Sequence, residues 1–259
     1  MSRITVLKLG GSVLRGREGY TVAADWLQAR LASTDDRFVV VVSAEHGHTD
    51  ALYREAQDLA NSTVSQSSNA HLSIPQLSIP QSDLLDLLWS TGEIRSVALL
   101  ALRLRALRVS GTGISVHETG LRVCDETDQI TFNPSTIRAA LAVHRVVVVP
   151  GFLATRANRV ITLGRGGSDW SAVLLAASLG ASRCELVKDV DGYFTADPNT
   201  DGAAELIPEL SYATALRMAD DGCPLVQRQA IAEAARARLP LIIRSLASQG
   251  TTVQERAQE

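Results

Sequence analysis

Stretches of apolar, β-forming residues alternate with helical patterns along the whole chain, and this alternation constrains the fold more than any other feature. Residues 4–9, 38–42 and 145–149 are apolar enough for strands buried on both faces, and 184–187 and 239–243 are shorter candidates. Between them, helical periodicity predicts helices over 22–32, 51–59, 83–107, 135–143, 168–179, 212–220 and 229–237. Such alternation is typical of βαβ units, so we predict an α/β fold with a mostly parallel central sheet.

Length and charge limit the classes of function. A chain of 259 residues can bury a large core in one domain or two lobes. Its net charge of −3 gives no support for a nucleic-acid surface, and no apolar stretch reaches membrane-spanning length. The three cysteines lack metal-ligand spacing and the N-terminus lacks a signal-peptide pattern. We therefore predict a cytoplasmic protein that binds neither nucleic acid nor membrane.

The glycine-rich stretch at 163–169 is the strongest local motif. Its glycines allow close approach of a ligand to the backbone, and Arg165 offers a planar fork for a carboxylate or phosphate. Ser168 and Asp169 begin the predicted helix, whose free N–H groups and dipole favour an anion. By itself the motif is also compatible with a turn that only packs a strand against a helix.

Three further motifs are weak by themselves. The Lys8–Ser12 turn follows the first predicted strand and suits a phosphate, or is only a tight turn beside a surface lysine. The carboxylates of 189–198 suit a ribose, a metal or a solvated loop. Residues 90–93 interrupt a helical pattern with a glycine and Glu93. The Glu93 carboxylate suits a ligand ammonium group, or the four residues form only a capping turn. His46 and His48 lack the further ligands that a metal site needs.

Residues 61–81 are rich in Ser, Asn and Gln and contain Leu-Ser-Ile-Pro-Gln twice, at 72–76 and 77–81. Two prolines in register exclude a regular helix there. We predict a loop insertion between helices; a lid or a partner-binding loop is the alternative.

Taken in order, these motifs resemble the amino acid kinase family, and most closely the catalytic domain of the aspartate kinases. The resemblance spans nearly the whole chain, and its stretches are 6–12, 41–44 with Thr49 and Asp50, 90–93, 148–152, 162–172, 189–198 and 210–215. It implies a three-layer αβα sandwich in one domain over 1–259, with an amino-acid-binding lobe over about 1–160 and a nucleotide-binding lobe over about 161–259. It also implies a homodimer.

The resemblance implies phosphoryl transfer from ATP to an amino-acid carboxylate, with L-aspartate as the first substrate to test. Lys8 and Asp169 would be catalytic, and Mg²⁺ would be held mainly by phosphate oxygens rather than by a protein metal site. The other implied roles are phosphate binding by Gly10, Gly11 and Ser12; substrate binding by Thr49, Glu93, Phe152, Arg165 and Ser168; and nucleotide binding by Asp189, Tyr193 and Asp197.

The chain departs from the aspartate kinase pattern on the nucleotide side. Lys188 replaces a threonine, Asn199 replaces an arginine, and the altered stretch 222–229 has Pro224 where a lysine is usual. The last two changes remove positive charge. We hypothesise that Lys188, as a nucleotide-binding residue, restores that charge together with Arg228; weaker ATP binding or a changed nucleotide preference is the alternative.

Several functions remain open from the sequence. Arg165 and Glu93 together favour a free α-amino acid, because an acylated amine would leave Glu93 unpaired. A kinase of glutamate or of an unusual amino acid, and a non-catalytic binding homologue, remain alternatives. Aspartate kinases usually continue into ACT regulatory domains, whereas this sequence ends soon after 239–243. We therefore expect an isolated catalytic domain, without an ACT domain, that lysine and threonine do not inhibit.

Overall fold

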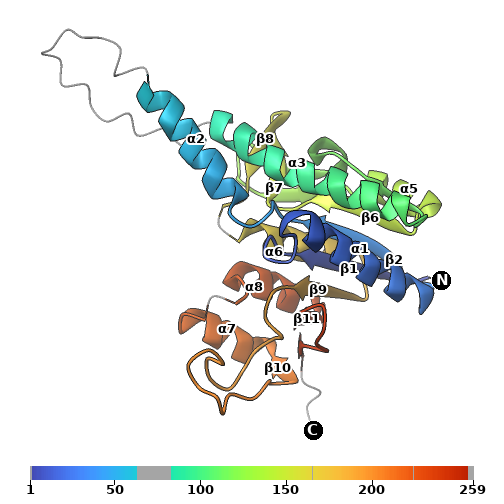
Figure 1. Cartoon of the computed structure of the whole chain (residues 1–259), viewed down its shortest axis with the longest axis vertical. Coiled ribbons are helices and arrows are strands. Elements are labelled where there is room, and N and C mark those ends of the chain that lie inside the picture. Colours follow the sequence, from blue (N-terminus) through green and yellow to red (C-terminus); the bar gives the residue numbers. More distant parts are fainter. Residues whose placement is uncertain (1, 63–82, 165, 224, 256–259) are drawn as a thin grey trace, which may run out of the picture.

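The computed structural model describes residues 2–62, 83–164, 166–223 and 225–255, and at its centre lies one eight-stranded sheet (Figure 1). Each neighbouring pair of its strands is parallel except β11 and β12. This confirms the predicted α/β fold with a mostly parallel sheet. In spatial order the strands are β10 (Glu209–Ser211), β12 (Thr251–Gln254), β11 (Leu241–Arg244), β9 (Arg183–Val187), β1 (Ile4–Leu9), β2 (Arg37–Val42), β6 (Val146–Pro150) and β3 (Gly111–Gly113).

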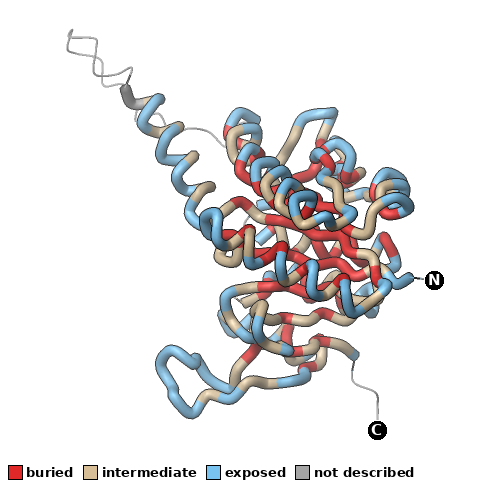
Figure 2. The backbone as a smooth tube through the Cα atoms, turned by 45° about the vertical axis from the view of Figure 1, so that its right-hand side comes forward, coloured by how far each residue is buried: buried red, intermediate tan, exposed pale blue. Residues whose placement is uncertain are grey.

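The middle strands are apolar on both faces because helices cover both sides of the sheet. In β2, Val39 and Val41 belong to one core cluster, whereas Val40 and Val42 belong to the other. All four side chains are fully buried, and Figure 2 shows buried residues running through the middle of the molecule. Unbroken apolar runs therefore mark strands of a middle layer, and sequence alone predicts them well.

Helices form the two outer layers, which confirms the three-layer αβα arrangement (Figure 1). On one face, α1 and α3 contribute Leu27 and Leu100 to the core; on the other, α5, α6 and α8 contribute Ile137, Leu175 and Ile231. The helix α2 packs on α3 and projects from the body of the molecule. The helices are α1 (Gly16–Ala32), α2 (His48–Ser62), α3 (Asp83–Ala106), α4 (Val116–Thr119), α5 (Ser135–Val143), α6 (Gly167–Leu179), α7 (Tyr212–Asp220) and α8 (Arg228–Ala237).

A second, four-stranded sheet was not predicted. Its order is β5 (Ile130–Phe132), β4 (Leu121–Val123), β7 (Leu153–Arg156) and β8 (Arg159–Thr162), and β8 lies against α3. Strands of three or four residues contain too few positions to establish an alternating pattern. The expected lobe boundary near residue 160 falls inside β8, and the large sheet contains strands from both sides of that boundary. The division of the chain into two lobes stays a prediction.

Three local predictions need correction. The helix α3 runs unbroken through Ser90–Glu93, and its glycine permits close packing: a Cβ at Gly92 would lie 2.9 Å from Cβ of Ala44. The sequence alone predicts a frayed tail over the last nine residues, 251–259, but Thr251–Gln254 forms β12 and Thr251 is fully buried. The helix α2 continues to residue 62, so residues 61 and 62 are helical and not part of the expected loop insertion; residues 63–82, with the repeat at 72–81, lie outside the described part.

The carboxyl ends of β1, β2, β6 and β9 meet at one edge of the large sheet, because these strands are parallel neighbours. Backbone hydrogen bonds extend the pairing one residue beyond the strands, from Gly10 to Val187 and from Gly151 to Val42. Four loops are thereby held together at this edge, where ligands of parallel sheets collect. Among the described residues, no helix has both the length and the apolar character needed to cross a membrane.

Candidate active site

Lys8 and Asp169 form a buried ion pair at this edge of the sheet. Lys8 lies near the end of β1, and its Nζ is 2.8 Å from Oδ1 of Asp169. Asp169 lies in the first turn of α6, where the helix dipole favours negative charge. The two residues are 7% and 4% exposed, so water screens their attraction little. The structure thus brings together the two residues that were predicted to be catalytic.

Lys188 binds the second oxygen of the same carboxylate. It follows β9 directly, its N–H donates to the Arg244 carbonyl (2.8 Å), and its Nζ lies 2.9 Å from Oδ2 of Asp169. Burial opposes ionisation of Asp169, but attraction to Lys8 and Lys188 outweighs burial and lowers the pKa of this carboxyl. Burial lowers the pKa of the Lys188 ammonium group, against the attraction of Asp169. In this Lys8–Asp169–Lys188 cluster, two cations share one anion.

The Gly10–Ser12 turn leaves β1 beside the cluster. A Cβ at Gly11 would lie 2.4 Å from the carbonyl oxygen of Ala44, so the close approach of the loop after β2 requires glycine. The amide of Gly10 donates to the Val187 carbonyl (3.1 Å), which differs from the prediction that it cradles a phosphate. Within the described part of the chain, the amides of Gly11 and Ser12 donate to no protein acceptor, so phosphate binding stays a prediction for these two.

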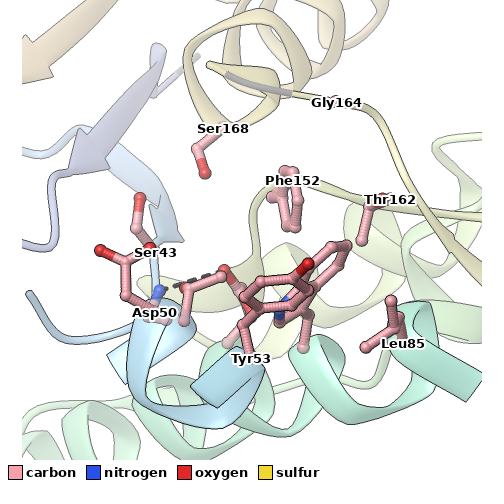
Figure 3. Close-up of a pocket in the computed structure, with 12 residues that line it drawn as sticks. Ser43, Asp50, Tyr53, Leu85, Phe152, Thr162, Gly164 and Ser168 are labelled. Carbon is pink, nitrogen blue, oxygen red and sulfur yellow. Dashed lines mark hydrogen bonds between the residues drawn. The ribbon is translucent and has the colours of Figure 1, made fainter. Parts of the chain in front are cut away.

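A cavity of about 610 Å³ opens next to the cluster, at the start of α6 (Figure 3). Four residues predicted to bind the substrate line it, although they come from four separate segments: Thr49, Glu93, Phe152 and Ser168. Because Ser168 precedes Asp169 in the chain, the cavity and the cluster meet at the first turn of α6. The structure therefore gathers these four predicted residues around one space; their role as substrate ligands stays a prediction.

Glu93 is the buried acidic group of this cavity. It is 3% exposed, its Oε1 accepts a hydrogen bond from the amide of Ala44 at 3.3 Å, and its Oε2 has no partner among the described residues. Burial raises the pKa of Glu93 to about 7, against the lowering effect of the Ala44 amide. A carboxylate with one buried, unpaired oxygen is suited to a cationic ligand group.

Phe152 is held at the cavity in an uncommon backbone conformation. Its φ is +66°, in the left-handed region that non-glycine residues seldom adopt, and its amide donates to Oγ of Ser171 at 3.2 Å. Ser171 in turn donates to the carbonyl of Ser168. Conformations of this kind cost free energy and concentrate at functional sites. The hydrogen bonds from α6 thus fix the backbone that carries the Phe152 ring into the cavity.

The predicted nucleotide residues do not all converge. Asp189 follows Lys188 and is exposed, whereas Tyr193 is 2% exposed and packs in the core, so its side chain is not accessible to a nucleotide in this structure. Burial also raises the pKa of Tyr193. Asp197 is exposed and accepts hydrogen bonds from the amide and side chain of Asn199, which closes a turn. The roles of Asp189 and Asp197 stay predictions.

The altered stretch 222–229 borders the glycine-rich motif. A Cβ on Gly166 would overlap the side chain of Gln227, which therefore packs directly against it. Arg228 pairs with Asp220 at 2.6 Å on the surface, so it does not join Lys188 as hypothesised. Arg165, predicted to bind the substrate carboxylate, and Pro224 lie outside the described residues, and the role of Arg165 stays a prediction.

Three cavity residues lie outside every motif that the sequence analysis used: Tyr53, Leu85 and Trp89. A signal for two of them exists, because Leu85, Trp89 and Glu93 are spaced four residues apart and share one face of α3. If Glu93 is assigned to a ligand site, the four-residue spacing places Trp89 and Leu85 at the same site. Without that step, leucine and aromatic residues on a helix are more readily assigned to the core.

Comparison with known proteins gives consistent results. The model of the amino acid kinase family matches residues 3–245. An aspartokinase of Thermus thermophilus is 38% identical over 181 residues, which are 68% of this chain and 45% of that protein. The chain spans about half the length of the curated relatives it matches.

Two solved structures each cover 99% of the chain. An aspartate kinase from Synechocystis has a TM-score of 0.79 and 30% identity, and 40% of its chain is matched. Aspartokinase III of E. coli, in complex with aspartate and ADP, has a TM-score of 0.75 and 26% identity, and 65% of its chain is matched.

Proposed function

The chain belongs to the amino acid kinase family, and from this premise we propose that it transfers a phosphoryl group from ATP to an amino-acid carboxylate. L-aspartate is the first acceptor to test, because the relatives are aspartokinases and one similar structure holds aspartate and ADP. The product would be an acyl phosphate. The geometry around Asp169 supports this reaction and the choice of a carboxylate as acceptor.

The pairing of Asp169 with two lysines is the observation that carries the proposal. Both carboxylate oxygens face an ammonium group and the pKa of Asp169 is lowered, so Asp169 is a poor general base near neutral pH. An acceptor hydroxyl would need such a base, whereas a carboxylate is already ionised. The cluster therefore favours a carboxylate, whose oxygen attacks the γ-phosphorus while the bond to the ADP oxygen breaks.

The two lysines would stabilise the transferring group electrostatically. Negative charge on the phosphoryl oxygens is best stabilised by fixed cations in a site that excludes water. Asp169 holds both ammonium groups in place, and because two cations share one anion, a phosphate oxygen would complete the charge balance. The amides of Gly11 and Ser12 would add donors for the same group.

Glu93 would orient the amino acid. Its unpaired Oε2 would accept the α-ammonium group, which would shift Glu93 to the ionised form. Phe152, Thr49 and Ser168 would complete the pocket, and Arg165 would pair with the α-carboxylate as the resemblance implies. The attacking carboxylate would then lie toward α6, where Ser168 and the cluster meet.

Magnesium would accompany ATP rather than occupy a protein cage. In the described part of the chain, no three His, Cys, Asp or Glu side chains form a group that would hold a metal ion. The cluster presents cations and amides, which suit phosphate oxygens, and Mg²⁺ would neutralise further phosphate charge when bound with them. Mg²⁺ use and a homodimeric assembly stay predictions of this proposal.

The test is ADP release and acyl-phosphate trapping by hydroxylamine across a panel of amino acids, with Lys8→Ala as the inactive control. Hydroxamate formed with aspartate would support the proposal, and hydroxamate formed with another acceptor would redirect it to that substrate. N-acetylglutamate should give none, because its acylated nitrogen carries no positive charge to pair with the Glu93 carboxylate. ATP binding without hydroxamate from any acceptor would instead support a non-catalytic homologue.

A further inference from the structure

The helices α2 and α3 contribute an apolar surface to the cavity, beside their polar residues Thr49, Asp50 and Glu93. Tyr53 of α2 and Trp89 of α3 face each other there, with ring centroids 6.2 Å apart, and the buried Leu85 lies one helical turn from Trp89. Figure 3 shows Tyr53 and Leu85 across the cavity from Ser168. The proposed function uses the polar groups of Thr49, Glu93 and Ser168 and assigns no role to Tyr53, Leu85 or Trp89. We name Tyr53, Leu85 and Trp89 the aromatic wall.

The cavity is larger than a four-carbon amino acid needs. Its volume of about 610 Å³ lies in the range of pockets that bury much larger ligands. Even at roughly 30 Å³ per non-hydrogen atom, the volume of a water molecule in the liquid, aspartate would fill less than half of it. An aspartate held by Glu93 and oriented toward α6 would not fill the part of the cavity beside the aromatic wall.

Trp89 also has an unused hydrogen-bond donor. Its Nε1 is buried and has no acceptor among the described residues, as is true of Oε2 of Glu93, one turn further along α3. A buried, unpaired donor costs roughly 1–3 kcal/mol, so such groups usually have a partner. Glu93 and Trp89 thus line the cavity from one face of α3, one helical turn apart, and each carries one buried polar atom without a partner among the described residues.

We propose that the preferred acceptor is an amino acid larger than aspartate, with an alkyl or aryl extension that lies against the aromatic wall. The extension carries an oxygen that accepts the Trp89 Nε1–H, while the free ammonium group binds Glu93. This inference rests on the proposed function, whose site it specifies. Contact with two aromatic rings and a leucine would give such an extension apolar contacts that aspartate lacks.

The experiment compares L-aspartate with 3-benzyloxy-L-aspartate, which adds an ether oxygen and a phenyl ring, by calorimetric titration and by hydroxamate formation. We expect 3-benzyloxyaspartate to bind at least tenfold more tightly. Trp89→Phe, which removes the donor and keeps a ring, should lower the ratio of the two affinities about tenfold. Trp26→Phe on α1 is the matched control, because Trp26 contacts Arg30 rather than the cavity, and should leave the ratio unchanged.

Tyr53→Ala provides a second variant, since Tyr53 is 37% exposed and its truncation removes little of the core. It should lower the same ratio, and unfolding curves establish that each variant is folded. Binding of 3-benzyloxyaspartate no tighter than aspartate overturns the inference, even if aspartate is phosphorylated. Tighter binding with no hydroxamate from any acceptor supports the inference on the ligand and overturns the proposed function instead.

Discussion

Nζ of Lys188 lies 2.9 Å from Oδ2 of Asp169, so the residue that follows β9 supplies a second cation to the carboxylate that Lys8 already binds. The backbone fixes this arrangement, because β9 pairs in parallel with both β1 and β11 and the Lys188 amide bonds to Arg244. The position where the family pattern has threonine therefore places a second cation beside Asp169, and its compensation for the lost nucleotide-side charge stays a prediction.

Replacing Lys188 with alanine should weaken ATP binding about ten- to a hundredfold. The variant loses one of the two cations that pair with Asp169, and hydrogen bonds to charged groups contribute roughly 1.5–3 kcal/mol. Titration with a fluorescent ATP analogue measures the change. Arg228→Ala is the control, because Arg228 pairs with Asp220 on the surface and its loss should change affinity less than twofold. Unchanged affinity in Lys188→Ala would show that Lys188 does not compensate for the altered nucleotide residues.

Asp169→Asn should destabilise the protein by about 3–5 kcal/mol, because removing one partner leaves buried charges uncompensated. Added pyrophosphate should recover part of this loss by supplying an anion between the two lysines. Urea unfolding with and without pyrophosphate measures both effects. Asp189→Asn, at the exposed neighbour of Lys188, should show neither effect; an equal gain from pyrophosphate in both variants would contradict the argument.

Glu93→Gln should make the free protein more stable above pH 7 and impair amino-acid binding. The pKa of Glu93 is about 7 in the folded protein and about 4.3 when unfolded, so the folded state binds more protons between these values. The free energy of unfolding therefore falls as pH rises from about 4.3 to about 7, and the uncharged glutamine escapes this loss. The expected gain at pH 8 is about 1–3 kcal/mol in urea unfolding.

The same substitution separates stability from function. Amino-acid affinity of the unaltered protein should increase as pH rises through about 7, because only ionised Glu93 pairs with an ammonium group. In Glu93→Gln the affinity should be at least tenfold lower and independent of pH in this range. A variant that is stabilised yet binds the amino acid as before would show that Glu93 is not the ammonium ligand.

Sequence reasoning succeeded where a pattern has one physical cause. Apolar runs such as that of β2 indicate strands covered on both faces, and the motifs at Lys8 and Asp169 lie at strand and helix ends that the topology must bring together. It failed where packing decides between two uses of one residue. Gly92 permits close helix packing rather than a break, and Tyr193 fills the core rather than the site.

The aromatic wall illustrates the same limit. Leucine and aromatic residues on a helix are typical of a core face, and only the position of α2 beside α3 shows that Tyr53 and Trp89 line a cavity. The hydrogen bonds of Thr251 also join segments that are far apart in the chain. Its Oγ1 accepts a hydrogen bond from the Tyr193 amide and donates one to the Ile207 carbonyl. Contacts between residues so far apart in the chain leave no local pattern.

Gly11→Ala and Gly10→Ala should differ sharply although the two positions are adjacent. A Cβ at Gly11 would lie 2.4 Å from the backbone oxygen of Ala44, which cannot move without displacing the loop that bonds to Glu93. A Cβ at Gly10 would meet its nearest atom, the Val187 oxygen, at 3.4 Å, an ordinary contact. We therefore expect kcat/KM to fall at least a hundredfold in Gly11→Ala and less than tenfold in Gly10→Ala, with aspartate affinity reduced only in the former. Equal losses would indicate that the amides, rather than the packing of the two loops, limit the site.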